Sequence, residues 1–86
     1  MRKVSFAPQA YKDFIDWSRY NVELFQKINE LIKESLREPF KGIGKPEPLK
    51  GNLKGCWSRR INQEHRLVYI VNHDELYILS CHGHYE

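Results

Sequence analysis

The fold of this chain is decided by residues 56–81, which read CWSRRINQEHRLVYIVNHDELYILSC. Three runs rich in strand-forming residues follow one another here, over 56–61, 65–71 and 75–81. The polar segments 62–64 and 72–74 separate them. Short runs of this kind, joined by polar turns, predict a three-stranded antiparallel meander.

Upstream of the meander, the sequence predicts one short strand and two helices. Residues 3–6, KVSF, alternate polar and apolar side chains as a strand does. Pro8 suits a first helical position, and apolar residues at three-to-four-residue spacing predict a helix to about Tyr20. Asn21 is a good N-cap for a second amphipathic helix that ends near Glu38. We therefore expect an α+β fold, with two N-terminal helices packed on a twisted antiparallel sheet.

The length and composition of the chain favour one globular domain, residues 1–86. Eighty-six residues, of which 41% are hydrophobic, are enough for one core and too few for two. No apolar run reaches the roughly 20 residues that span a bilayer, and the N-terminus lacks the apolar middle of a signal peptide. We expect a cytoplasmic protein with no membrane contact, whose two cysteines, Cys56 and Cys81, stay as free thiols.

The positive charge is concentrated in one part of the chain. Between Lys41 and Arg66 there are seven Lys or Arg and two acids, a local net charge of +5 in a chain whose total is +3. Residues 40–55 in the same region are rich in Gly and Pro, which predicts a long connection of the kind that often carries function. A concentrated basic segment favours a polyanionic partner, of which nucleic acid is the commonest.

Glu47 lies between Pro46 and Pro48, with Lys45 and Lys50 as its nearest charges in the sequence. Most glutamates on loops are simply solvated, and this is one interpretation of Glu47. The other is a carboxylate that accepts a proton during catalysis, held stiffly by the two prolines.

Arg59, Arg60 and Arg66 fall on neighbouring strands of the predicted meander. Strand alternation sends Arg59 and Arg60 to opposite faces, so one face can gather two of the three arginines. Together with Lys50 or Lys54 they could grip phosphate oxygens through bidentate hydrogen bonds. The alternative is a sheet face whose charges only keep the protein in solution.

The last predicted strand can extend through residues 82–85, in which case His82 and His84 project from the same side of it, next to Cys81. This triplet lacks the second ligand pair of a usual zinc site, so a histidine that donates a proton is favoured over a metal centre. A carboxylate, arginines and a histidine together match metal-independent RNA cleavage, in which the 2′-hydroxyl of the RNA is the nucleophile. We expect no cofactor.

Three segments of the chain closely resemble YoeB/Txe toxins of the RelE-like superfamily: INELIKE (28–34), PFKGIGKPEPLKGNLKGCWSRRINQEHRLVY (39–69) and the pair His84-Tyr85. The resemblance implies the toxin of a type II toxin–antitoxin pair, a ribosome-dependent endoribonuclease that cuts mRNA in the ribosomal A site. It implies a microbial-RNase-like fold. It also implies as partners mRNA, the 70S ribosome with its rRNA and a cognate antitoxin, with operator DNA reached only through that antitoxin. A homodimer is implied by the family alone.

The same resemblance assigns roles to residues. It makes Glu47 the general base, Arg66 the phosphate-binding residue and His84 the general acid. The expected substrate contacts are Tyr85, Lys50 and Arg60, with Lys54 and Arg59 as further candidates. His82 receives no catalytic role, so we expect it to be a neighbour that tunes His84.

Two other classes of function remain open at this point. A non-catalytic module could bind RNA or an antitoxin with the same basic surface. A DNA-binding regulator is the weaker alternative, because both predicted helices spend their apolar faces on the core and neither is a recognition helix.

Overall fold

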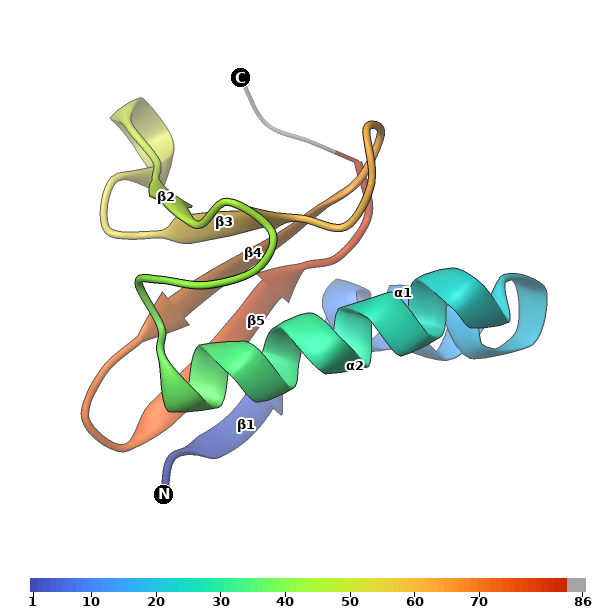
Figure 1. Cartoon of the computed structure of the whole chain (residues 1–86), viewed down its shortest axis with the longest axis horizontal. Helices are drawn as coiled ribbons and strands as arrows, with labels where there is room; N and C mark the ends of the chain where they lie inside the picture. Colours follow the sequence, from blue (N-terminus) through green and yellow to red (C-terminus); the bar gives the residue numbers. More distant parts are fainter. Residues whose placement is uncertain (84–86) are drawn as a thin grey trace.

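A five-stranded sheet with the strand order β1-β5-β4-β3-β2 lies at the centre of the structure, a computed structural model that describes residues 1–83. Two helices, α1 (Pro8–Tyr20) and α2 (Val22–Arg37), pack on the sheet (Figure 1). A short 3-10 turn, η1 (Gly51–Leu53), follows the second strand. The strands are β1 (Lys3–Phe6), β2 (Glu47–Pro48), β3 (Trp57–Arg60), β4 (Arg66–Val71) and β5 (Glu75–Ser80). The predicted α+β class is confirmed.

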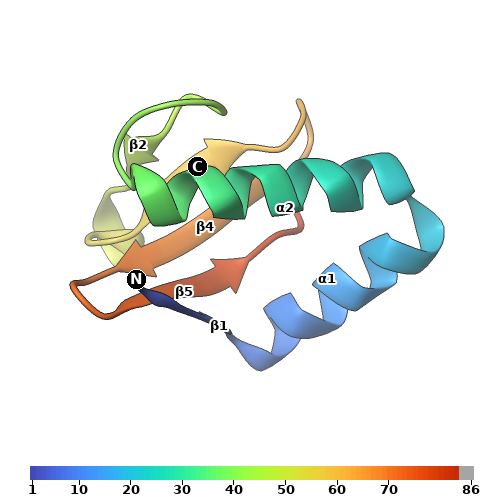
Figure 2. The same cartoon turned by 60° about the horizontal axis from the view of Figure 1, so that its bottom comes forward.

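The two helices form a hairpin that turns at Asn21. Its backbone N–H donates to the carbonyl of Trp17 at the end of α1, and its side-chain oxygen accepts from the N–H of Leu24 at 3.2 Å. One asparagine therefore caps both helices, which is why the break between them needs only one residue. Figure 2 shows the two helices joined by this tight turn on the same side of the sheet.

The core lies between α2 and the helix-facing side of the sheet. Burial of an apolar side chain here contributes about 1.5–3 kcal/mol, so this layer is the main source of stability. Its fully or nearly fully buried members are Ala10, Ile28, Leu31, Ile32, Ile61, Leu67, Tyr69, Leu76, Ile78 and Cys81.

The sheet is mixed, whereas the sequence predicted an antiparallel one. The meander β3-β4-β5 is antiparallel as expected, but β1 pairs with β5 in parallel, with Lys3 opposite Glu75 and Phe6 opposite Ile78. Parallel neighbours need a long crossover, and the helical hairpin and the meander between β1 and β5 supply it. Alternation of side chains predicts a strand and its buried face, but it does not reveal the direction of the partner.

The predicted connection over 40–55 contains one more strand. β2 pairs with β3 at the sheet edge through Glu47 opposite Ser58 and Pro48 opposite Trp57. Proline is tolerated at a sheet edge because it lacks only the N–H that an inner strand would need. At the other end of the described chain, β5 stops at Ser80, so the strand does not continue through His82 as the sequence suggested.

Both cysteines are free and buried, as expected from the sequence. Burial raises the pKa of the Cys56 thiol, and burial together with the charge of Asp13 raises the pKa of the Cys81 thiol to about 12. Both groups are thus neutral thiols near pH 7. Among residues 1–83 there is no helix with the length and apolar character needed to cross a membrane.

Candidate active site

The strand register places Glu47, Arg60 and Arg66 on one face of the sheet. Glu47 is opposite Ser58, and Ser58 shares its face with Arg60 because side chains two apart on a strand point the same way. Arg60 is in turn opposite Arg66 on β4. This face is the one turned away from the helices, since Leu67, next to Arg66, belongs to the core.

Glu47 is exposed at the start of β2, between Pro46 and Pro48. Its strand is anchored to β3 by the hydrogen bond from the N–H of Leu49 to the carbonyl of Cys56 at 2.9 Å. No side chain of the described residues pairs with the carboxylate of Glu47. The acid is therefore held by its backbone and remains available to a ligand.

The segment before Glu47 depends on a glycine. Gly44 accepts a hydrogen bond from the N–H of Arg60 at 2.6 Å and has φ +81°. A Cβ at this position would lie 2.9 Å from Leu31 Cδ2, 3.1 Å from Arg59 Cβ and 3.2 Å from the carbonyl oxygen of Arg60. Gly44 thus combines a left-handed backbone with a close approach that other residues would not allow.

Arg59 lies inside the protein, which corrects the expectation that it contacts RNA. Its side chain is 0% exposed, and its Nε donates to the hydroxyl of Tyr69 at 3.2 Å. Its terminal nitrogens donate to the carbonyls of Glu38, Lys41 and Ile43. The physical reason is strand alternation, because Arg59 faces the helices while Arg60 faces outward. Arg59 braces the segment that leads from α2 to β2.

Arg66 is half-buried at the start of β4 and points toward the turn between β3 and β4. Its Nη1 donates to the carbonyls of Asn62 at 2.6 Å, Gln63 at 3.3 Å and His65 at 3.1 Å. Within residues 1–83 the other guanidinium nitrogens of Arg66 make no hydrogen bond or ion pair. The turn thus fixes one edge of the guanidinium and leaves the rest for an anion.

The end of the described chain is hydrogen-bonded to the start of β4. The N–H of Arg66 donates to the carbonyl of Gly83 at 2.8 Å, and the N–H of Gly83 donates to Nδ1 of His65 at 2.8 Å. Gly83 is the last described residue, so His84 and Tyr85, predicted as acid and substrate contact, lie outside the described residues.

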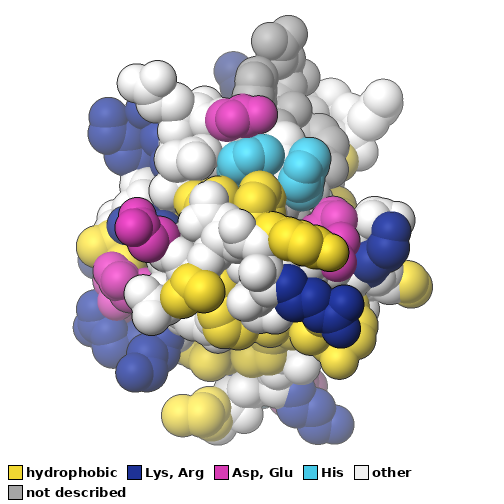
Figure 3. All heavy atoms as spheres, turned by 90° about the vertical axis from the view of Figure 1, so that its right-hand side faces the viewer, with side chains coloured by type: hydrophobic (Ala, Val, Ile, Leu, Met, Phe, Trp, Pro, Cys, Tyr) yellow, Lys and Arg dark blue, Asp and Glu magenta, His cyan; other side chains and the backbone are white. Residues whose placement is uncertain are grey.

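His82 is exposed and stacks on Trp17 of α1, with ring centroids 5.6 Å apart and planes at 21°. The ring of His65 lies 4.8 Å from that of His82 and 4.9 Å from that of Trp17. Figure 3 shows histidine side chains next to one another on this side of the molecule, above a group of hydrophobic side chains. Within the described part of the chain, no three His, Cys, Asp or Glu side chains are grouped as metal ligands.

The remaining predicted substrate contacts, Lys50, Lys54 and Arg60, are all exposed. Lys50 and Lys54 flank the 3-10 turn η1, and Arg60 shares the open sheet face with Glu47 and Arg66. Carboxylate and cations on one face are suited to a phosphodiester, because the acid can accept a proton while the cations hold the phosphate oxygens.

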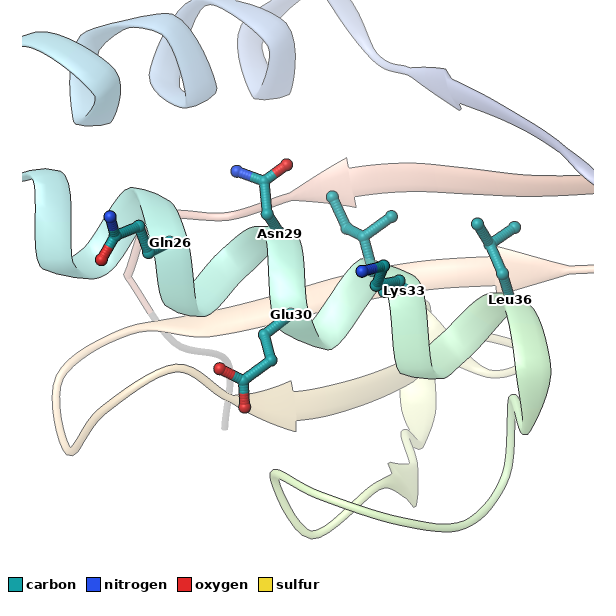
Figure 4. A pocket seen from close by; sticks show the side chains of 6 residues that line it. Gln26, Asn29, Glu30, Lys33 and Leu36 are labelled. Carbon is teal, nitrogen blue, oxygen red and sulfur yellow. The ribbon is translucent and has the colours of Figure 1, made fainter.

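A hollow of about 560 Å³ lies elsewhere, along α2 (Figure 4). Successive turns of the helix line it with Gln26, Asn29, Glu30, Ile32, Lys33 and Leu36. None of these residues is on the sheet face that carries Glu47 and Arg66.

Two residues near the sheet face that carries Glu47 and Arg66 were given no role from the sequence. Ser58 lies directly between Glu47 and Val68 in the register and is 5% exposed. His65 is 6% exposed and contacts Gly83 through its ring. One sequence signal could have found His65: it begins the predicted strand 65–71, directly before Arg66, so alternation turns a polar ring toward the covered face.

Comparison with known proteins agrees with the resemblance seen in the sequence. Residues 6–85 match the family model described as YoeB-like toxin of bacterial type II toxin-antitoxin system. The chain is 51% identical over 83 residues to Toxin YoeB of Escherichia coli K12, covering 96% of this chain and 99% of that protein.

Two solved structures from Staphylococcus aureus are also similar. The YoeB–YefM complex contains a chain with a TM-score of 0.91 and 48% identity, covering 99% of each chain. The YoeB dimer has a TM-score of 0.92 and 47% identity, covering 98% of each chain. This chain therefore belongs to the YoeB-like toxins of bacterial type II toxin–antitoxin systems.

Proposed function

We propose that this toxin is a ribosome-dependent, metal-independent endoribonuclease that cuts mRNA in the ribosomal A site and so inhibits translation. The observation that carries the proposal is the shared sheet face of Glu47 and Arg66, with Gly83 bonded to the backbone of Arg66. The residue after Gly83 in the sequence is His84, the proposed general acid.

The proposed reaction is an internal transfer within the RNA. Glu47 takes the proton of the 2′-hydroxyl, and the 2′-oxygen attacks the adjacent phosphorus. Arg66 stabilises the charge that grows on the non-bridging oxygens, using the guanidinium edge that the turn leaves unbonded. His84 gives a proton to the departing 5′-oxygen. The products are a 2′,3′-cyclic phosphate and a free 5′-hydroxyl, so neither metal nor protein nucleophile is required.

The substrate is held by cations around this face. We assign RNA backbone contacts to Lys50, Lys54 and Arg60, which are exposed on and beside it, and substrate positioning to Tyr85. Arg59 is not included because its guanidinium is bonded inside the protein. Phosphate contacts of this kind give affinity without base preference, which suits an enzyme whose register on mRNA is set by the ribosome.

The proposed partners are inferred from the relatives. YoeB from Staphylococcus aureus is found in a complex with YefM in one of the similar structures and as a dimer in the other. We therefore infer an antitoxin of that kind and a homodimer for this chain, with operator DNA bound only through the antitoxin. Its place of action is the cytoplasm, where the ribosomes are.

The test is primer-extension mapping of a defined mRNA, in the presence of a chelator, with and without programmed ribosomes. We expect cuts in the A-site codon that need ribosomes and disappear in Glu47→Ala and His84→Gln. Glu30→Ala is the matched control, since Glu30 is an exposed acid on α2. A folded wild-type protein that leaves the mRNA intact would instead favour a non-catalytic module that binds RNA or antitoxin.

A further inference from the structure

We propose that His65 is a positioning residue of this nuclease, because its Nδ1 holds the backbone of Gly83 and thereby directs the chain that leads to His84. The inference rests on the proposed function for its effect on catalysis. The contact itself is a feature of the fold and can be tested without any activity.

The direction of the hydrogen bond fixes the state of the imidazole. A backbone N–H can only donate, so at 2.8 Å from Gly83 N the Nδ1 atom of His65 must offer its lone pair. The ring is therefore neutral when the contact is made, with its proton on Nε2. A side chain without an acceptor at this position leaves the N–H of Gly83 unpaired.

The ring of His65 has little freedom to move away from this position. It is 6% exposed and packs edge-on against Trp17 with ring centroids 4.9 Å apart. Its backbone N–H donates to Oδ1 of Asn62 at 2.7 Å, and its carbonyl accepts from the N–H of Ile61 at 3.0 Å. Both the backbone and the ring of His65 are thus fixed before any substrate arrives.

The two hydrogen bonds of Gly83 go to consecutive residues. Its N–H reaches the ring of His65, and its carbonyl accepts from the N–H of Arg66. Gly83 has φ +74°, a left-handed conformation that glycine adopts without strain. His65 therefore helps to fix the backbone of Gly83, the residue before His84 in the sequence, and it does so beside the proposed phosphate-binding arginine.

The residues before Gly83 are held by other contacts. Trp17 Nε1 donates to the carbonyl of Cys81 at 2.9 Å, and the hydroxyl of Ser80 donates to the carbonyl of His82 at 3.2 Å. Loss of the His65 contact should thus free the backbone N–H of Gly83 while the preceding segment stays in place. A reacting group displaced by about 1 Å can lower a rate by about a hundredfold.

The experiment compares two substitutions in the full chain. His65→Asn keeps an acceptor near the position of Nδ1 but removes the ring. His65→Phe keeps the ring against Trp17 but removes the acceptor. His73→Phe is the control, since His73 is an exposed histidine in the turn between β4 and β5.

Two measurements are made on each variant: amide hydrogen exchange of Gly83 by NMR, and single-turnover cleavage with separate measurement of ribosome affinity. For His65→Phe we expect amide exchange of Gly83 to become at least about tenfold faster and cleavage at least about tenfold slower. Ribosome affinity should not change. His65→Asn should stay within about threefold of wild type in both, and His73→Phe should match wild type.

Equal cleavage rates in His65→Phe and wild type would overturn the inference, and so would equal losses in the Asn and Phe variants. Unchanged protection of Gly83 in His65→Phe would overturn it as well. If His65→Phe does not fold, His65→Gln replaces it. The amide of glutamine reaches the position of Nε2, so this variant also lacks an acceptor at the position of Nδ1. A wild-type protein with a protected Gly83 and no cleavage would count against the proposed function alone.

Discussion

Arg59 and Arg60 are neighbours in the sequence with opposite environments. The guanidinium of Arg59 is buried and bonded to three backbone carbonyls and a hydroxyl, whereas Arg60 is exposed. We predict that Arg59→Met costs about 3 kcal/mol or more in the free energy of unfolding, because the carbonyls lose their donors. Arg60→Met should stay within about 0.5 kcal/mol of wild type.

Urea unfolding followed by circular dichroism measures both variants of this pair. Cleavage by Arg60→Met should nevertheless be weakened, since this variant loses an RNA contact although its stability is unchanged. Equal stability losses in the two variants would show that Arg59 does not brace the loop.

Cys81 predicts a dependence on alkaline pH. Burial raises the pKa of its thiol to about 12 in the folded protein, against an ordinary value of about 9. Above about pH 9 the unfolded chain releases a proton that the folded chain keeps, so the free energy of unfolding falls between about pH 9 and 12. Thermal unfolding across that range should show this slope in wild type and a shallower slope in Cys81→Ala.

The same shift protects the thiol from alkylating reagents. At pH 8 the thiolate fraction of folded Cys81 should be about a thousandfold smaller than in the unfolded chain. Iodoacetamide labelling followed by mass spectrometry should be much slower for Cys81 in the native protein than in denaturant, because burial also blocks the reagent. Rapid labelling of Cys81 in the native protein would contradict the buried position.

Among the elements, the short strand β2 depends most on the segment that precedes it. Gly44 sits at φ +81° against Leu31 and the backbone of Arg60, whereas Gly51 has φ +62° with nothing within 4 Å of an added Cβ. We predict that Gly44→Ala costs about 2–4 kcal/mol, from the left-handed backbone and overpacking together. Gly51→Ala should cost only about 1 kcal/mol, since it meets the backbone penalty alone.

Chemical denaturation of the two alanine variants compares these costs. If Gly44 also sets the position of Glu47, as its hydrogen bond to Arg60 indicates, Gly44→Ala should slow cleavage more than Gly51→Ala does. A Gly51→Ala variant that is the less stable of the two would refute this account of β2.

The elements that the sequence predicted well are those with local signals. The ends of α1 and α2 are set by Pro8, Asn21 and Pro39, whose effects act within one turn of a helix. The parallel direction of β1 was not predictable, because it is set by pairing with a strand about 70 residues away. The buried role of Arg59 was missed for a similar reason, since alternation separates Arg59 from Arg60 without saying which face the helices cover.

For the molecule as a whole, the distribution of charge predicts how RNA binding responds to salt. Arg60 and Arg66 lie on the open face, and three exposed lysines, Lys45, Lys50 and Lys54, lie before and after β2 in the chain, which makes five cations in this region. If each contacts one phosphate of single-stranded RNA, the slope of log K against log salt concentration is about −3.5. Binding to programmed ribosomes, measured at several salt concentrations, gives this slope.

Single substitutions show how much each residue contributes to the slope of log K against log salt concentration. Lys50→Gln should reduce its magnitude by about 0.7, whereas Lys33→Gln on α2 should leave it unchanged. A flat response to salt, or an equal change in both variants, would remove the open sheet face as the RNA-binding surface.

The pairing of β1 with β5 also bears on how the protein is made. β1 leaves the ribosomal exit tunnel before the other strands of this sheet, but its partner is the last strand of the sheet in chain order. During synthesis β1 therefore has no hydrogen-bonding neighbour until almost the whole described chain has emerged. Contacts so distant in sequence close slowly, because loop entropy is lost before they form. The nascent chain thus lacks its finished sheet until β5 has left the tunnel and paired with β1.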